Sequence, residues 1–192
     1  MIAIIDYNAG NVRSVQNALK RLGAESFVTA DLEKIKNADK VIFPGVGEAS
    51  SAMKTLEETG LRQLIPTLKQ PVLGICLGQQ LMCKNLEEGN TKGLGIFDID
   101  VRRFPAKLPV PHMGWNNLTN LKSSLFEGLR EQNDVYFVHS YYCEISEYTS
   151  TVCDYILPFS AGLQKDNFYA MQFHPEKSGK TGEKMLENFV KL

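Results

Sequence analysis

The feature that most constrains the fold is a short apolar run that ends at a cysteine with a glycine two residues away on either side. The run, residues 72–75, is typical of a buried strand. After it, Met82 and Leu86 are four residues apart, which predicts a helix over residues 79–88. Residues 71–80 therefore predict a strand, a tight turn and a helix in direct succession.

The cysteine in this turn is Cys76, between Gly74 and Gly78. A strand, a tight turn and a helix form a nucleophile elbow, in which the middle residue is strained and neighbouring side chains would clash. Backbone N–H groups at the helix start would favour the thiolate form of such a cysteine. The same pattern also fits a buried structural cysteine that packs as a small hydrophobic residue, so both interpretations stay open here.

The first half of the chain alternates short apolar runs with stretches of helical periodicity. We expect strands over residues 2–6, 26–29 and 41–43, and helices over residues 12–22, 49–58 and 61–69. Strands that alternate with helices predict a parallel sheet with right-handed crossovers.

The pattern changes from about residue 93, where alternating apolar and polar residues become common. We expect strands over residues 97–104, 135–145, 151–156 and 160–173, the last as a hairpin that turns near residues 165–167. We also expect a short helix over 123–129 and a closing helix over 180–192. Residues 112–116 are expected in a loop or short strand. The whole pattern predicts one α/β domain over residues 1–192. Its central sheet is mixed and mostly parallel, helices flank it, and the C-terminal half adds an antiparallel sheet.

Composition excludes several classes of function. The 21 basic and 22 acidic residues nearly cancel, so bulk charge does not favour nucleic acid or an anionic membrane. The four cysteines lack metal-binding spacing and form no disulfide framework, so we expect neither a metal nor another cofactor. No apolar stretch approaches about 18 residues, and the start lacks the basic region of a signal peptide. We expect a cytoplasmic protein.

A thiol nucleophile needs a base, and the base needs a group that orients it. His174 and Glu176 are separated by one proline. In an extended segment, residues two apart point to the same side, so the carboxylate reaches one ring nitrogen while the other faces a partner. A surface turn containing the same three residues is the alternative.

Residues 44–47 form a second glycine loop after a predicted strand. In hydrolases with a nucleophile elbow, the oxyanion hole combines the N–H after the nucleophile with one from another strand-end loop. Here those groups would be the N–H of Leu77 and one from residues 45–47. A plain glycine turn would leave the same pattern.

Together these motifs resemble the class I (triad) glutamine amidotransferases and, within them, the glutaminase subunits of imidazole glycerol phosphate synthases. The resemblance covers essentially the whole chain, and the segment 112–116 is its most specific part. The matching segments are 6–11 (DYNAGN), 44–47 (PGVG), 74–78 (GICLG), 112–116 (HMGWN), 137–141 (FVHSY) and 172–178 (QFHPEKS). One departure is Gln79, where the family commonly has methionine, and we expect it to alter helix packing slightly and not the chemistry.

The resemblance implies a flavodoxin-like amidotransferase domain that hydrolyses glutamine. It implies that Cys76 attacks the side-chain amide, that His174 transfers protons and that Glu176 orients His174. The remaining implied site residues are Leu77, Val46 and Gly47 for the oxyanion hole and Gly45, Gln80, Ser140 and Tyr141 for substrate. We interpret His139 as structural, and Cys83, Cys143 and Cys153 as inert core thiols.

The resemblance further implies a heterodimer with a (βα)8-barrel cyclase, which receives the ammonia directly and acts in histidine biosynthesis. A chain of this length leaves no room for that second domain, so we expect it on another polypeptide. The candidate partner face consists of Asn8, Asn11, Trp115, Asn116 and Lys177. We also expect the free subunit to hold the Val46 peptide turned away from the site until the partner binds.

Three alternatives remain at this point. In the first, the chain is a glutaminase that serves a different synthase, such as one that assembles pyridoxal phosphate or amidinates a surface sugar. In the second, it is a cysteine peptidase or chaperone of a related single-cysteine fold, although those lack a late histidine-x-glutamate pair. In the third, it is an interaction subunit that kept the fold without catalysis.

Overall fold

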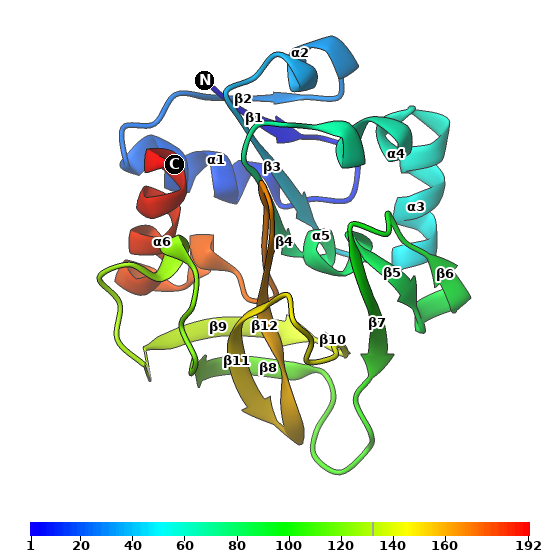
Figure 1. The fold of residues 1–192 in the computed structure, drawn as a ribbon, viewed down its shortest axis with the longest axis vertical. Helices are drawn as coiled ribbons and strands as arrows, with labels where there is room; N and C mark the ends of the chain where they lie inside the picture. The colour runs from blue at the N-terminus through cyan, green and yellow to red at the C-terminus, as the bar shows by residue number, and fades with distance from the viewer. Residues whose placement is uncertain (132) are drawn as a thin grey trace.

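The computed structural model describes residues 1–131 and 133–192, and within them eleven strands form one mixed sheet (Figure 1). Five neighbouring strands run parallel, in the order β2-β1-β3-β4-β13. They are β1 (Ile2–Ile5), β2 (Ser26–Thr29), β3 (Lys40–Gly45), β4 (Val72–Cys76) and β13 (Phe168–Met171). Beyond β13 the order continues as β12-β10-β7-β5-β6, with β11 paired to β12. These strands are β5 (Cys83–Leu86), β6 (Thr91–Lys92), β7 (Phe97–Arg103), β10 (Tyr141–Cys143), β11 (Thr149–Tyr155) and β12 (Leu157–Lys165).

Helices cover both faces of the parallel strands because alternate residues of each strand point to opposite sides. Ile2 and Ile4 pack against α1 and α6, whereas Ala3 and Ile5 share the other core with α2, α3 and α4. Figure 1 shows α1 and α6 together on one side and α3 and α4 on the other. The helices are α1 (Val12–Arg21), α2 (Leu32–Lys36), α3 (Ala49–Glu58), α4 (Leu61–Leu64), α5 (Leu77–Leu81) and α6 (Gly179–Lys191). The expected single α/β fold is therefore confirmed.

The helix predicted over residues 79–88 is wrong beyond its first turn. Helix α5 ends at Leu81, and the chain continues as strand β5, which pairs with β7 in parallel and with β6 antiparallel. A spacing of four residues also places two side chains on the same face of a strand, so Met82 and Leu86 did not distinguish the two structures.

Three other predictions needed adjustment. Residues 61–69 split into α4 and a 3-10 turn (Ile65–Thr67), because Pro66 has no N–H to continue the helix. The short helix over 123–129 is a 3-10 turn (Ser124–Phe126), capped by the Ser123 hydroxyl. The strand over 135–145 is interrupted at Ser140 and forms β9 (Asp134–His139) and β10.

Strand β9 pairs with β8 (His112–Asn117) as a separate two-stranded ribbon. Residues of β8 alternate between its two sides. His112 and Asn116 face inward, whereas Met113 and Trp115 are 63% and 59% exposed. The ribbon therefore presents two large apolar side chains outward.

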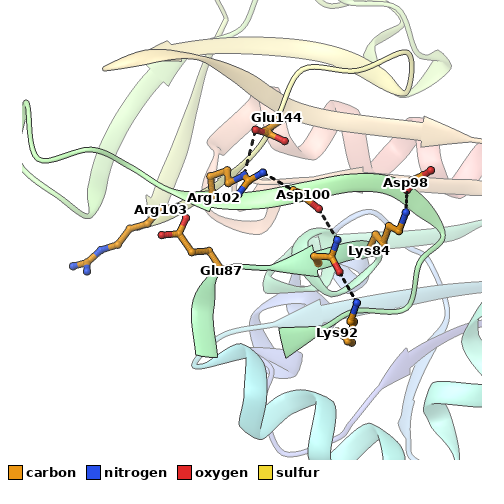
Figure 2. Close-up of polar contacts among 9 residues, drawn as sticks. Lys84, Glu87, Lys92, Asp98, Asp100, Arg102, Arg103 and Glu144 are labelled. Atoms are coloured by element: carbon orange, nitrogen blue, oxygen red, sulfur yellow. Dashed lines mark hydrogen bonds and ion pairs between the residues drawn. The ribbon is translucent and has the colours of Figure 1, made fainter. Parts of the chain in front are cut away.

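Charged side chains cover the solvent face of β7 and hold the neighbouring strands in place (Figure 2). Lys84 of β5 pairs with Asp98 at 2.7 Å, and Arg102 contacts Asp100 at 2.9 Å and Glu144 at 3.3 Å. Exposed pairs of this kind contribute about 0–1 kcal/mol each, so their effect on stability is small. This charged face is consistent with β5 being a strand.

No helix among the described residues is long and apolar enough to cross a membrane.

The closest backbone approach near the elbow gives a test of stability. A Cβ atom on Gly78 would overlap the carbonyl oxygen of Phe43, whereas one on Gly23 would meet open space at a φ of +71°. We expect Gly78→Ala to lower the free energy of unfolding by more than about 3 kcal/mol, because backbone must move. Gly23→Ala should cost only about 1 kcal/mol for the left-handed conformation. Urea denaturation measures both, and equal losses would contradict this account.

Candidate active site

The elbow holds Cys76 in a strained conformation at the end of β4. Its backbone has φ +55° and ψ −111°, a region that residues with side chains rarely adopt. The conformation is possible because Gly74 packs against the Met82 sulfur and Gly78 lies against the backbone of Phe43. The sulfur therefore stands above the sheet at the start of α5, where the first N–H groups have no partner within the helix.

His174 and Glu176 come from the segment after β13, and their side chains are 2% and 1% exposed. The Glu176 Oε1 atom lies 2.8 Å from Nδ1 of His174, so the carboxylate accepts the Nδ1–H. The other ring nitrogen, Nε2, is buried and has no hydrogen-bond partner within residues 1–131 and 133–192. The hydrogen bond at Nδ1 therefore orients the ring, and Nε2 remains available to a reacting group.

Cys76 and His174, almost a hundred residues apart in sequence, line one pocket of about 330 Å³. Burial lowers the pKa of His174, but the Cys76 sulfur and the Glu176 carboxylate outweigh it and raise the pKa to about 10. The charged imidazolium is thus favoured beside the sulfur, as a thiolate–imidazolium pair requires.

The other two histidines are held neutral. Burial lowers the pKa of His139 to about 3, and burial lowers the pKa of His112 to about 4. They contact each other at 2.9 Å between His112 Nδ1 and His139 Nε2, and His139 Nδ1 lies 2.7 Å from the Tyr141 carbonyl oxygen. Three histidines in one region therefore divide into one charged ring and two neutral rings.

The glycine loop reaches the same pocket, but its central N–H points elsewhere. Val46 and Gly47 line the pocket, whereas Gly45 lies deeper, where an added Cβ would collide with the Tyr7 hydroxyl and with Leu77. The Val46 N–H donates to the Ala9 carbonyl at 2.6 Å. Leu77 is the first residue of α5, next to Cys76.

The residues expected to contact substrate also meet here. Gln80, Ser140 and Tyr141 line the pocket with Cys76. The structure adds Glu88, which lines the same pocket and accepts the Ala49 N–H at 2.9 Å. Burial raises the pKa of Glu88. Sequence reasoning missed this residue because it was placed at the end of a predicted helix, and no local motif marks it.

The expected partner residues lie outside the pocket. Trp115 projects from the outer side of β8, whereas Asn116 faces inward and donates to His112 Nε2 at 3.3 Å and to the Asp154 carbonyl at 3.1 Å. Asn8 follows β1 and is exposed, and Asn11 accepts the Ser14 hydroxyl at the start of α1. Lys177 is exposed on the 3-10 turn that carries Glu176. In the part of the chain that the structure describes, no group of three or more His, Cys, Asp or Glu side chains is arranged to hold a metal ion.

Comparison with known proteins gives one consistent result. The sequence model of the glutamine amidotransferase class-I family matches residues 3–192. Imidazole glycerol phosphate synthase subunit HisH of Bacteroides fragilis is 60% identical over 194 residues, which cover 100% of this chain and 99% of the relative. The subunit of the same name from Haemophilus influenzae is 48% identical, covering 98% of this chain and 96% of the relative.

Solved structures agree on the fold. A crystal structure of a glutamine amidotransferase superposes with a TM-score of 0.75 at 20% identity, covering 100% of this chain and 98% of the other. A structure of PurLQS from Thermotoga maritima gives a TM-score of 0.74 at 16% identity, covering 99% of this chain and 97% of that one. At these identities the likeness concerns the fold alone.

The three histidines make a prediction for titration by NMR. Because their pKa values are about 4 and about 3, His112 and His139 should stay neutral across about pH 6–8, whereas His174 should keep its proton. Glu176→Gln should lower the titration midpoint of His174, because a neutral amide no longer stabilises the imidazolium. A midpoint for His174 near the ordinary histidine value in the unmodified protein would refute this assignment.

Proposed function

Because the chain belongs to the class-I glutamine amidotransferase family, we propose that it is a glutaminase subunit of an imidazole glycerol phosphate synthase. It hydrolyses glutamine to glutamate and ammonia through a thioester on Cys76. The observation that carries this proposal is the Nε2 atom of His174, which has no hydrogen-bond partner among the described residues, in the pocket that Cys76 lines and with Glu176 on the opposite nitrogen. The free thiols of all four cysteines support a cytoplasmic location.

The reaction proceeds in two steps. The Cys76 thiolate attacks the side-chain amide carbon, and His174 gives its proton to the nitrogen that leaves as ammonia. Neutral His174 then takes a proton from water, which attacks the thioester and releases glutamate. Glu176 holds the ring in one orientation throughout and stabilises its charged form.

The developing oxyanion is stabilised by the N–H groups of Leu77 and Val46, with Gly47 providing the flexible end of the loop. One such donor is typically worth about 3 kcal/mol of barrier, or about 10²-fold in rate. The Val46 N–H is bonded to Ala9, so its peptide must rotate before it can serve. That peptide joins Gly45 to Val46, so its rotation changes ψ of Gly45 and φ of Val46, and Gly45 has no Cβ to restrict the change. The isolated subunit is therefore slow, and partner binding shifts the loop toward the active arrangement.

The α-groups of glutamine are bound by Gln80, Ser140 and Tyr141, which line the pocket with Cys76. Gly45 lies behind them, where a side chain would displace the Tyr7 hydroxyl and Leu77. Glu88 supplies a carboxylate for the α-ammonium group, a charge-assisted contact. This set recognises an amino acid by its charged end and leaves the amide beside Cys76.

The partner is a (βα)8-barrel cyclase, which consumes the ammonia in forming imidazole glycerol phosphate and aminoimidazole carboxamide ribotide. Ammonia in neutral water is mostly protonated and unreactive, so direct transfer preserves the nucleophile. The outer side of β8 is next to the pocket, because Val138 and His139 of the paired strand line it. Trp115 is the aromatic anchor of the partner face, which also includes Asn8, Asn11 and Lys177. Asn116 points to the inner side of β8 and contributes to this face by holding the ribbon through His112 and the Asp154 carbonyl.

Glutamine hydrolysis by the purified chain tests this function. We expect low turnover alone and a rise of about 10²-fold or more with the cyclase and its nucleotide ligand, because the second oxyanion donor becomes available. Cys76→Ala should abolish turnover in both states, and Cys153→Ala is a matched control at a buried thiol outside the pocket. Equal turnover with and without the cyclase, or activity that survives Cys76→Ala, would refute the proposal.

Substrate recognition by Glu88 has its own test. Glu88→Gln should raise the KM for glutamine about 10- to 100-fold with little change in kcat, because a charge-assisted hydrogen bond is lost. Glu48→Gln is the matched control, since Glu48 caps α3 through the N–H groups of Ser50 and Ser51. That variant should lose about 1 kcal/mol of stability and keep its KM. An equal rise in KM in both variants would contradict substrate binding by Glu88, because the effect would then come from the start of α3.

A further inference from the structure

Gln172 is a fully buried amide beside the reactive sulfur, and the mechanism above gives it no role. It follows β13 directly and precedes the segment that carries His174. Its Nε2 atom lies 3.9 Å from the Cys76 Sγ, the long end of the range for an N–H donor to sulfur. Its Oε1 atom accepts from Gln80 Nε2 at 2.9 Å.

The direction of this amide is determined by a backbone carbonyl. A carbonyl oxygen only accepts, so the Gln80 group that lies 3.1 Å from the Tyr141 oxygen must be its NH₂. The second hydrogen of that NH₂ goes to Gln172, which must therefore present its oxygen to Gln80. The NH₂ of Gln172 is then left facing the sulfur.

A second chain of donors holds the same carbonyl from the other side. His139 Nδ1–H donates to the Tyr141 oxygen, so His139 Nε2 is unprotonated and accepts from His112 Nδ1–H. His112 Nε2 in turn accepts from Asn116 of β8. Every donor in this chain points the same way, which requires both rings to be neutral, in agreement with their lowered pKa values. The carbonyl that orients Gln80 and Gln172 is thus held by the ribbon β8–β9.

Ionisation of the Cys76 thiol changes which of its contacts are favourable. In the neutral thiol, S–H donates to the Val138 carbonyl at 3.9 Å. In the thiolate that donor is gone and the carbonyl oxygen repels the charge, whereas the N–H from Gln172 attracts it more strongly. Gln172 therefore favours the ionised form selectively.

We propose that Gln172 is a further catalytic residue, whose side-chain N–H stabilises the Cys76 thiolate in an orientation set by Gln80 and the Tyr141 carbonyl. Its effect on turnover rests on the proposed glutaminase function, but its effect on the sulfur does not. His139 and His112 act as positioning residues through that carbonyl.

Alkylation of Cys76 by iodoacetamide across a pH series tests the proposal without glutamine. Cys76 is the most exposed of the four thiols at 7%, and mass spectrometry of its peptide follows it alone. Gln172→Leu should raise the pH midpoint of alkylation by about half a unit to one unit, because a hydrogen bond to the charged form is lost. Gln172→Glu should raise it further by placing oxygen atoms beside the sulfur, and it keeps the contact to Gln80 if the leucine variant fails to fold.

Gln79→Leu is the matched control. Gln79 lies on α5, is as fully buried as Gln172, and donates to the Ser160 carbonyl at 3.0 Å and to Cys143 Sγ at 3.3 Å. Its loss should leave the Cys76 midpoint unchanged. The titratable groups around the sulfur are His174 with its partner Glu176 after β13, the buried Tyr7 hydroxyl after β1, His139 of β9, Tyr141 of β10 and Glu88 in the pocket wall. All of them are kept in every variant.

An unchanged midpoint in both Gln172 variants, or an equal shift in Gln79→Leu, would overturn the proposal. Glutamine turnover in the presence of the cyclase, measured in parallel, should fall about 3- to 10-fold in Gln172→Leu, in proportion to the lost thiolate. If the wild type does not hydrolyse glutamine while the midpoint still shifts, the proposed function fails and the role of Gln172 at the sulfur stands.

Discussion

The structure depends on the contact between the elbow and the neighbouring strand β3. Gly78 lies directly against the Phe43 carbonyl, and this contact lets α5 begin immediately after β4. The backbone of Cys76 is then forced to a positive φ, which lifts the sulfur above the carboxyl ends of the parallel strands. The glycine loop of β3 and the segment after β13 end at the same edge, since both strands flank β4. The contact between Gly78 and Phe43 thus places the sulfur at the edge of the sheet where the glycine loop and the segment with His174 also end.

Around that sulfur, burial and hydrogen bonding assign different charges to chemically identical rings. His174 keeps a carboxylate on one nitrogen and a sulfur near the other, so its charged form is favoured despite burial. His112 and His139 have only neutral hydrogen-bond partners, so burial dominates and lowers both pKa values, and the positive charge on His174 lowers the pKa of His139 further. The charged ring of His174 can transfer protons, whereas the neutral rings of His112 and His139 fix the hydrogen bonds to the Tyr141 carbonyl.

Much of this was predictable from local patterns, and the failures have identifiable causes. Helix α3 and strands β1 and β2 follow directly from periodicity. Strand β5 did not, because apolar residues four apart fit both a helix and a strand, and only pairing with β7 and β6 decides between them. Glu88 could not be found for the same reason, since its place in the pocket depends on where β5 leads the chain.

By itself, the sequence determined the residues of the elbow, the spacing of His174 and Glu176, and the glycine loop, because these depend on short-range sterics and on side-chain parity along an extended segment. Only the tertiary structure decided that the Val46 N–H is bonded to Ala9, that Glu88 joins the pocket and that Gln172 directs its amide at the sulfur. Each of those facts is a contact between segments that are far apart along the chain, and their geometry follows from sheet order and packing, which no local pattern encodes.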